Sequence, residues 1–356
     1  MGAPPNAPGD EAALAIVVVT YRSGQAAGAT LAALSEQLRE HDELIVVDNA
    51  SGDETLANVR EAAPRAQVLE QRANLGFAGG CNAGVAATTA PLLLLLNPDA
   101  APMPGCLDAL RAAALEHPDW GAWQALVTLP GGTEINTSGG ITHFLGMGWA
   151  GRCGEPVSVA PSDPSEVSFA SGAALMVRRE DWNRLDGFDE RYFMYGEDLD
   201  LSLRLWLAGR GVGVVPAARV AHAYDFEKGA RKWFLLERNR GWTVLSDYPG
   251  VLLVLLAPAL LLSELALLAV ALRGGWLQQK LRAQLAVGRE LPAILGRRRQ
   301  VQRTKAVCAA DFAARLSAEL DSPYLAGSAR LDPLVALQRA YWRAVKALLQ
   351  RGAQLE

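Results

Sequence analysis

Three acidic residues, Glu197, Asp198 and Asp200, lie within four positions of one another, directly after Gly196. A carboxylate held in a fixed position can accept a proton from a hydroxyl group, which is the work of a general base. The same acids could instead only stabilise the start of a helix, where the helix dipole favours negative charge. A helix that opens at Glu197 would crowd all three into its first turn. We interpret Asp198 and Glu197 as candidate catalytic residues.

A second set of polar residues follows two apolar runs. Asn97 and Asp99 come directly after five leucines at 92–96, and His222 follows the apolar run 212–215. Each has a structural alternative, because an Asp after a strand often caps a helix and a lone His is often structural. Paired in space, Asp99 and His222 would supply oxygen and nitrogen ligands for a divalent ion that also holds two phosphates.

Apolar runs that alternate with helical stretches must position these residues. Strands are predicted at 14–20, 44–48, 68–70 and 92–96, and this rhythm is typical of a parallel α/β sheet. The all-leucine run is expected to be a central strand that is buried on both faces. Open parallel sheets bind ligands at the carboxyl ends of their strands. Thr20, Tyr21, Asp48, Asn97 and Asp99 all lie at such ends, so this edge is the predicted active site.

A glycine-rich run, 74–84, lies between the third and fourth predicted strands. Its glycines could let backbone N–H groups approach a phosphate. The run lacks the spacing of the dinucleotide and phosphate-binding loop motifs, so a plain turn is an equally good interpretation.

Charge is distributed unevenly along the 356 residues. Residues 1–226 hold 14 Lys and Arg against 28 Asp and Glu, whereas 227–356 hold 20 against 10. The acidic part suits metal binding, and the basic part suits anionic lipid or nucleic acid, between which composition does not choose. Residues 1–13 lack the pattern of a secretory signal and are expected to be a disordered lead-in. The four cysteines form no CxxC pair, so we expect reduced thiols in the cytoplasm.

The run 251–272 contains 22 residues with one charge, Glu264, and is long enough to span a bilayer as a helix. Basic residues precede and follow it, so both flanks look cytoplasmic. Pro258 and Glu264 would also be costly in a spanning helix. We therefore favour a re-entrant or interfacial hairpin that docks on an anionic leaflet, with a true span and a buried core or oligomer contact as alternatives. The tail after 303 is expected to form amphipathic helices for packing or self-association.

A set of motifs occurs in a fixed order: VVVTYRS, IVVDNASGDET, NLGFAGGCNAG, LLLLLNPDA, SGAALMVRR, LDGFDERYFMYGEDLDLSLR, VAHAY and ERNR. With these motifs the chain resembles glycosyltransferase family 2, which has the GT-A fold, over residues 14 to about 245. It is most similar to the rhamnosyltransferase-type members that modify bacterial cell-surface glycans.

The resemblance implies roles for individual residues. Asp198 matches the catalytic base, Asp99 the last acid of the family's DxD motif, and His222 a downstream histidine that can complete a Mg²⁺ or Mn²⁺ site. Asn97 stands where that motif has its first acid, which leaves the metal one fewer charge. The donor-binding residues expected on the same grounds are Thr20, Tyr21, Asp48, Asn74, Gly76, Asn82, Asn97 and Gly172.

The sequence therefore predicts an inverting transferase that moves a sugar, rhamnose being one candidate, from a dTDP- or UDP-sugar to a lipid-linked or cell-surface saccharide. Its predicted fold is α/β, a GT-A sheet flanked by helices with a C-terminal membrane-associated helical extension. The expected boundaries are 1–13, 14–246, 247–305 and 306–356. The expected location is the cytoplasmic face of the inner membrane, peripheral or monotopic, with an anionic lipid surface as partner, no nucleic acid, and self-association left open. The alternatives are a nucleotidyltransferase and a noncatalytic membrane-bound scaffold of transferase ancestry.

Overall fold

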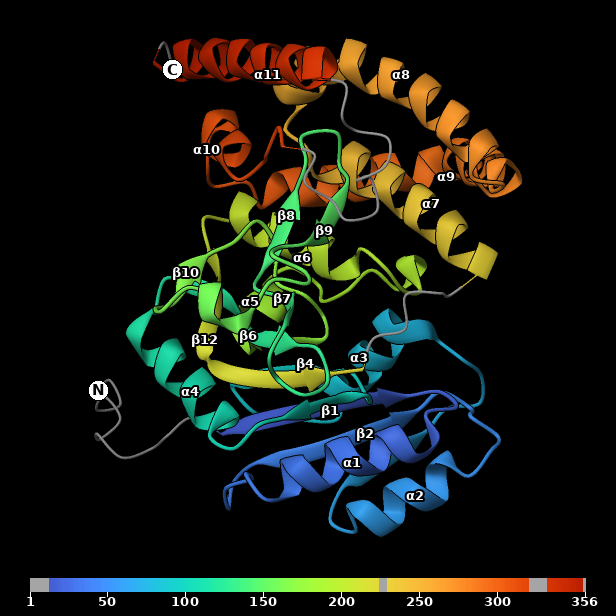
Figure 1. Ribbon diagram of the computed structural model, residues 1–356, viewed down its shortest axis with the longest axis vertical. Helices are drawn as coiled ribbons and strands as arrows, with labels where there is room; N and C mark the ends of the chain where they lie inside the picture. The colour runs from blue at the N-terminus through green and yellow to red at the C-terminus, as the bar shows by residue number, and fades with distance from the viewer. Residues whose placement is uncertain (1–12, 224–228, 320–331, 355–356) are drawn as a thin grey trace.

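The computed structural model describes residues 13–223, 229–319 and 332–354. All but the last residue of the predicted lead-in 1–13 lies outside the described residues. Ten strands form one mixed sheet with the order β10-β12-β6-β11-β4-β1-β2-β3, to which β5 and β7 add at β12 and β6. Helices flank this sheet, and further helices lie above it in Figure 1.

The four predicted strands are confirmed as a parallel block. They are β1 (Leu14–Thr20), β2 (Glu43–Asp48), β3 (Gln67–Glu70) and β4 (Leu92–Leu96), in the order β3-β2-β1-β4. All five leucines of β4 are buried, and β4 lies between β1 and β11, so it is the central strand that the sequence predicts. Alternate residues of β1 enter two different cores, one on each face of the sheet.

The other half of the sheet departs from a purely parallel order. Strand β11 (Ala174–Arg178) runs antiparallel between β4 and β6 (Trp120–Thr128), and β12 (Gly211–His222) runs parallel to β6. The shorter strands are β5 (Ala100–Pro102), β7 (Ile135–Thr137), β10 (Ser165–Glu166) and the separate hairpin of β8 (Gly140–Thr142) and β9 (Gly148–Ala150). Strand β11 brings residues 171–173 to the end of β4, where Asn97 N donates to Ala173 O at 3.1 Å.

Helices cover both faces of the sheet. Those that pack against the sheet are α1 (Gly24–Ser35), α2 (Thr55–Ala62), α3 (Gly76–Ala86), α4 (Cys106–Glu116), α5 (Arg179–Arg184) and α6 (Glu197–Leu207). Side chains of α1, α2 and α4 fill one core, and those of α3, α5 and α6 fill the other. Helix α6 opens at Glu197, as predicted, with its three acids in the first turn.

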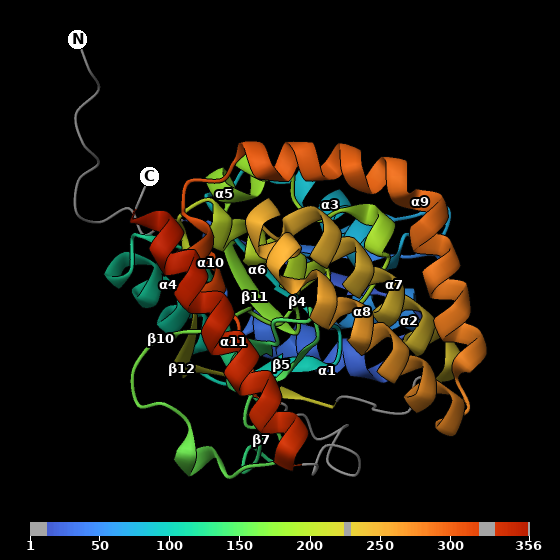
Figure 2. The same ribbon diagram turned by 90° about the horizontal axis from the view of Figure 1, so that it is seen from above.

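Five C-terminal helices form a layer over α6, as Figure 2 shows from above. They are α7 (Gly229–Asp247), α8 (Gly250–Arg273), α9 (Leu277–Arg303), α10 (Ala309–Ala314) and α11 (Asp332–Ala353). A third core joins α6 to α7, α8, α10 and α11. Buried ion pairs add to it, because Arg297 of α9 contacts Asp189 at 2.8 Å and Asp200 of α6 at 2.7 Å.

Helix α8 is the one described helix that is long and apolar enough to cross a membrane. It is continuous through Pro258, so the run 251–272 is not the re-entrant hairpin that we favour from the sequence; the chain turns later, at Gly274 and Gly275. Glu264 pairs with Lys280 at 2.7 Å and with Arg240, and Gln284 also donates to it. The single acid of α8 therefore points into the protein, and its charge is neutralised there.

Candidate active site

The ends of β1 and β2 meet around Asp48. Thr20 Oγ1 donates to Asp48 Oδ1 at 3.1 Å, Ser51 N donates to Oδ2 at 3.0 Å, and the Ser51 hydroxyl donates to Oδ1. The Asp48 carboxylate is buried, whereas Tyr21 beside it is 43% exposed. Three of the predicted donor-binding residues, Thr20, Tyr21 and Asp48, thus lie together. Thr20 and Asp48 are buried and polar, and Tyr21 exposes its aromatic ring.

The glycine-rich run forms a turn and helix α3. Asn74 Oδ1 accepts from Gly76 N at 2.8 Å, and Gly76 O accepts from Asn49 Nδ2 at 2.8 Å. Gly76 has a φ of +74°, and a Cβ there would lie 2.2 Å from Phe193 O. Only glycine fits this position, since both the left-handed backbone and the close approach exclude a side chain. The turn therefore packs against the loop that precedes the predicted base.

Asn82 lies in α3 and faces a different loop. Its Nδ2 donates to Phe188 O at 2.9 Å and to Glu190 Oε1 at 3.2 Å, and its Oδ1 accepts from Phe188 N at 3.2 Å. These contacts give Asn82 a structural role in holding residues 188–190. Its predicted role in donor binding stays a prediction.

The predicted metal residues meet at the end of β4. His222 Nε2 lies 3.1 Å from Asp99 Oδ1 and 3.3 Å from Asn97 Nδ2. Strand β5 positions them, because Ala100 of β5 pairs with His222 of β12. His222 is buried and the Asp99 side chain is 28% exposed. No group of three or more His, Cys, Asp or Glu that could hold a metal occurs in the described ranges, so this pair would need ligands from elsewhere.

The predicted base is held at the start of α6. Asp198 Oδ2 accepts from Gly172 N at 2.9 Å, and Oδ1 accepts from Leu199 N at 2.8 Å. Gly172 is one residue from Ala173, whose carbonyl bonds to Asn97 N, so the base and the metal residues lie along one edge of the sheet. Burial raises the pKa of Asp198 above its ordinary value of 3.8, and the two N–H groups partly oppose this.

Glu197 differs from Asp198 in its surroundings. Its side chain is 5% exposed, and its Oε2 accepts no hydrogen bond from any described residue. Burial, and then the negative charge of Asp198, raise the pKa of Glu197 well above its ordinary value. The surroundings therefore raise the pKa of Glu197 more strongly than that of Asp198, and such a difference between neighbouring acids is common in catalytic sites.

A strained loop leads into the base. Phe193, Tyr195 and Gly196 have φ values of 64°, 70° and 87°, which are costly for the first two residues. Asn239 of α7 holds this loop, since its Nδ2 donates to the carbonyls of Tyr192, Met194 and Tyr195 at 3.1, 3.0 and 2.6 Å. Asn239 lies in the ERNR motif, from which the sequence alone predicts no role for it. An amide within a charged helical stretch is the one signal that local sequence offers.

A buried polar network beneath the loop was also missed. Asp200 accepts from Arg204, Arg297 and Tyr192, and burial alone would raise its pKa, but the Arg204 and Arg297 charges lower it to about 2. Asp200, the third acid of the cluster, is thus a structural ion-pair partner. Nothing in local spacing predicts that a residue 97 positions away neutralises it.

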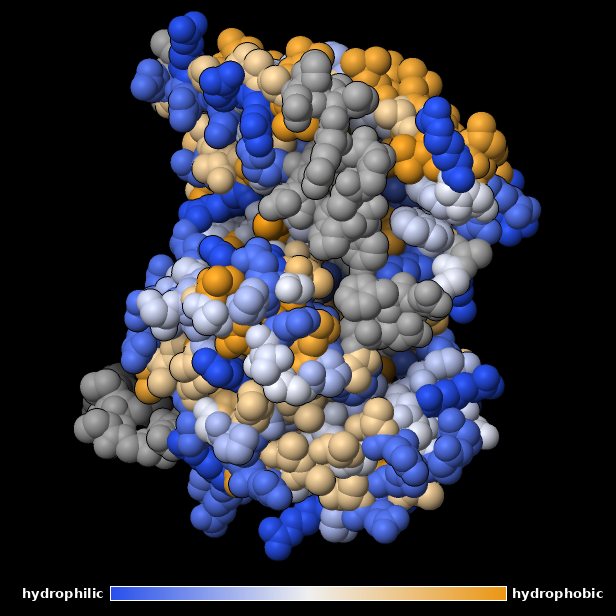
Figure 3. All heavy atoms as spheres, in the orientation of Figure 1, coloured by the Kyte–Doolittle hydropathy of each residue, from blue (hydrophilic) through white to orange (hydrophobic). Residues whose placement is uncertain are grey.

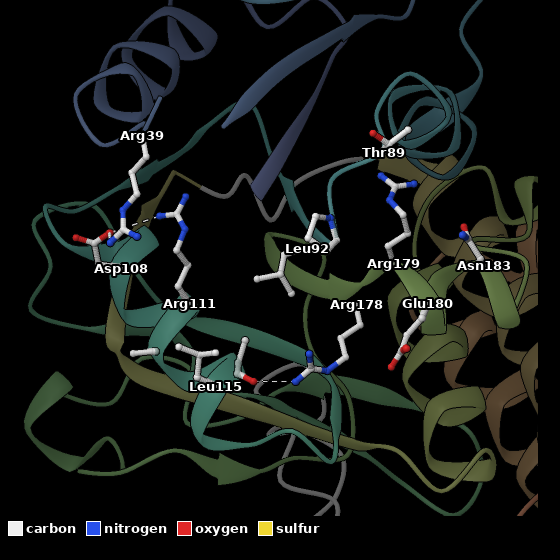
Figure 4. Close-up of a pocket in the computed structure, with 13 residues that line it drawn as sticks. Arg39, Thr89, Leu92, Asp108, Arg111, Leu115, Arg178, Arg179, Glu180 and Asn183 are labelled. Atoms are coloured by element: carbon white, nitrogen blue, oxygen red, sulfur yellow. Dashed lines mark hydrogen bonds and ion pairs between the residues drawn. The ribbon is translucent and has the colours of Figure 1, made fainter. Parts of the chain in front are cut away.

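A cavity lies away from this edge, near the amino end of β4 (Figure 4). It measures about 590 Å³ and has apolar walls with arginines around them. Arg111 pairs with Asp42, and Arg178 donates to the carbonyls of Trp120 and Ala114. These two arginines hold the fold together, so we do not assign the cavity to catalysis.

Comparison with known proteins gives matches over most of the described chain. Residues 15–181 match the family described as Glycosyl transferase family 2, and residues 161–228 match the family described as N-terminal domain of galactosyltransferase. The N-acetylglucosaminyl-diphospho-decaprenol L-rhamnosyltransferase of Mycobacterium tuberculosis is 32% identical over 266 residues, which cover 64% of this chain and 86% of that protein. Rhamnosyltransferase WbbL of Escherichia coli is 48% identical over 56 residues, 16% of this chain and 21% of that protein.

Among solved structures, the crystal structure of GalNAc-T7 with UDP, GalNAc and Mn²⁺ superposes with a TM-score of 0.54 at 16% identity. The match covers 67% of this chain and 48% of that one, so this chain spans about half of it. The likeness shows that the two chains share a fold.

Proposed function

Since this chain belongs to glycosyl transferase family 2 and is a glycosyltransferase, we propose that it moves a sugar from a nucleotide-activated donor to a hydroxyl group of a lipid-linked saccharide. The observation that carries the proposal is the placement of Asp198, held by Gly172 N–H at the sheet edge where Asp99 and His222 also lie. The relative's name supports the acceptor class, because that protein acts on a sugar attached to a diphospho-lipid. The same relative supports rhamnose as the transferred sugar. The carrier, dTDP or UDP, is proposed from the resemblance of the sequence motifs alone.

Asp198 is proposed as the general base. Each of its oxygens accepts one backbone N–H, which fixes the carboxylate and leaves a lone pair for a substrate proton. The carboxylate would take the proton of the acceptor hydroxyl as that oxygen attacks the anomeric carbon. A single displacement of this kind inverts the anomeric centre. Glu197 lies beside it, and burial, followed by the negative charge of Asp198, raises the pKa of Glu197 well above its ordinary value.

Asp99 and His222 fit a divalent cation. Their Oδ1 and Nε2 atoms lie 3.1 Å apart, and an oxygen with a nitrogen is a donor set that Mg²⁺ or Mn²⁺ accepts. When bound, the ion supplies positive charge that stabilises the departing diphosphate. Asn97 can contribute an amide group but no charge, so phosphate oxygens would supply the remaining ligands. Thr20, Tyr21, Asp48, Asn74, Gly76 and Gly172 are proposed to line the donor along the same edge.

Helix α8 supports membrane docking parallel to the surface. Every exposed residue from Val251 to Leu272 is apolar, and the large side chains among them are between 53% and 74% exposed. Figure 3 shows this face as an apolar patch at the top of the molecule. Leu252 and Leu256 of the opposite side are buried in the third core, and Glu264 is ion-paired. A spanning helix would have to give up these contacts, so an interfacial position is favoured.

This arrangement suits an enzyme on the cytoplasmic face of the inner membrane. The basic residues after 227 favour anionic lipid, and no nucleic acid is needed to explain them. The domain boundaries at 246/247 and 305/306 stay a proposal. The ion pair between Arg297 of α9 and Asp200 of α6 shows that the segment after 247 packs closely on the part before it. The same apolar face could join two copies, which is the competing outcome for the docking test below.

A donor screen tests the proposal. We expect one class among UDP-, dTDP- and GDP-sugars to raise the melting temperature of the full chain and to be slowly hydrolysed, because ligands that bind the native state stabilise it. Addition of EDTA should weaken the effect, and Mn²⁺ or Mg²⁺ should restore it. Failure of every nucleotide sugar to bind would contradict the function, and stabilisation that EDTA leaves unchanged would contradict the roles of Asp99 and His222.

A further inference from the structure

A small cavity lies between α7 and α9, on the side of the strained loop 193–196. It measures about 340 Å³ and is lined by Arg231 and Phe234 of α7 and by Gln279 and Arg282 of α9. A volume of this size suits a small ligand group, such as a phosphate with part of a sugar. None of these four residues has a role in the reaction described above.

Among the residues that the structure describes, Arg231 and Arg282 have no carboxylate partner, unlike their cationic neighbours. Lys280 and Arg240 are neutralised by Glu237 and Glu264, and the four side chains form one network between α7, α8 and α9. Arg231 and Arg282 form no ion pair within the described ranges, and both are exposed. Two guanidinium groups around one cavity favour an anion, and their geometry suits phosphate oxygens.

Gln279 adds a second feature of the cavity. Its Oε1 is buried and accepts no hydrogen bond from the described residues. A buried acceptor without a donor is costly, and a hydroxyl or amide N–H of a ligand would satisfy it. The cavity thus offers positive charge for a phosphate and an acceptor for a polar hydrogen, which together match a glycosyl phosphate or diphosphate.

The position of the cavity connects the proposed membrane surface to the base. Trp233 of α7 stacks on Trp276 at the α8–α9 turn, with ring centroids 4.8 Å apart, and tryptophan is favoured at bilayer interfaces. The Arg231 guanidinium lies 4.6 Å from the ring centre of Phe193, in the strained loop that precedes Asp198. A lipid chain at α8 and a sugar near Asp198 would place the linking phosphates between these two points.

We propose that Arg231 and Arg282 bind the phosphate groups of the lipid-linked acceptor in this cavity. The proposal rests on the proposed function for the identity of the acceptor, and it deepens that function by naming the phosphate subsite. Phe234 would contact the apolar or sugar part of the ligand, and Gln279 would accept its polar hydrogen.

The test uses the full chain without donor, with EDTA present, and farnesyl diphosphate as the probe. Binding is followed by calorimetry and by the intrinsic tryptophan fluorescence of the chain. We expect the double variant R231Q/R282Q to bind the probe about tenfold or more weakly, because charge-assisted hydrogen bonds are lost. The control R299Q, an exposed arginine of the same helix, should bind as the wild type does. Both variants should keep the wild-type melting temperature.

Further arms separate the sources of phosphate. Farnesol and inorganic pyrophosphate should each bind more weakly than farnesyl diphosphate. Partition of the double variant into neutral phosphatidylcholine vesicles, where the general attraction of basic residues to anionic lipid is absent, should be unchanged. The proposal is overturned if the double variant binds farnesyl diphosphate normally, if pyrophosphate alone binds equally well, or if vesicle binding falls with probe binding, which would indicate a headgroup site. If no nucleotide sugar binds, the proposed function fails, yet this comparison of phosphate binding still stands.

Discussion

Asp198 and Glu197 are neighbours in the chain, but their carboxyl groups meet different surroundings. Asp198 receives two backbone N–H groups and is partly open, whereas Glu197 is buried with one oxygen that no described residue satisfies. Hydrogen bonds to the charged form favour it, and burial without them favours the neutral form. The surroundings of Glu197 therefore favour its neutral form more strongly than those of Asp198 do.

The acidic limb of the pH profile should report Asp198. Because burial raises its pKa above the ordinary 3.8, the base is protonated and lost at a higher pH than a solvent-exposed Asp would be. We expect kcat/KM to fall with decreasing pH through a midpoint above 3.8, and donor affinity measured at each pH separates loss of the base from loss of the metal residues. A limb at or below the ordinary value, at constant donor binding, would contradict this environment for the base.

Residue types at strand ends could be read from the sequence, but their partners could not. The resemblance placed Asp99 beside His222, and these two do lie 3.1 Å apart. The sequence grouped Asp200 with the other acids, although Arg204 and Arg297 neutralise it. Long-range pairing of this kind depends on the tertiary structure, which local spacing does not encode.

At the scale of elements, periodicity located the parallel block well. Unbroken apolar runs with turn residues after them are a strong signal, and β1 and β4 have the predicted bounds. The antiparallel insertion of β11 was not foreseen, because direction within a sheet follows from connections rather than from composition. That insertion brings Gly172 next to the end of β4 and so places the backbone donor for Asp198.

The loop 193–196 depends on two elements that pack against it. On one side Gly76 approaches Phe193 O so closely that a Cβ has no room, and Ala78 N donates to the same oxygen at 3.2 Å. On the other side the Asn239 amide contacts three carbonyls. Strained backbone persists only where its surroundings hold it, so α3 and α7 together fix the start of α6.

At the scale of the whole molecule, the C-terminal helices continue the catalytic body rather than trail from it. Their side chains share a core with α6, and Arg297 joins α9 to that helix. Length and hydropathy predicted α8 from the sequence, but only packing shows which of its faces is covered. Deleting 251–272 would therefore uncover the third core, and point substitutions on the exposed face are the better test.

Substituting Leu262 and Leu265 with glutamate should release the protein from membranes. Both side chains are at least 60% exposed on the apolar face, so the folded chain should tolerate the change. Loss of two leucines from an apolar phase costs roughly 3 kcal/mol or more, which predicts at least a hundredfold weaker partition into anionic vesicles. The matched control is Leu115→Glu on α4, a leucine that is 75% exposed away from this face.

Vesicle sedimentation with size-exclusion chromatography decides between the two outcomes. Unchanged partition of the double variant would refute docking through α8. A shift from dimer to monomer with unchanged vesicle binding would show instead that this face joins two copies.

The central claim is that Asp198 removes the acceptor proton, and the Asp198→Asn variant tests it most directly. Asparagine keeps the size of the side chain and cannot act as a base at neutral pH, so the rate of sugar transfer should fall by about 10²- to 10⁴-fold. Donor affinity, measured by calorimetry on the same preparation, should stay within about twofold of the wild-type value, because the donor is bound by other residues. Transfer at the wild-type rate by a variant that binds donor normally would contradict the account.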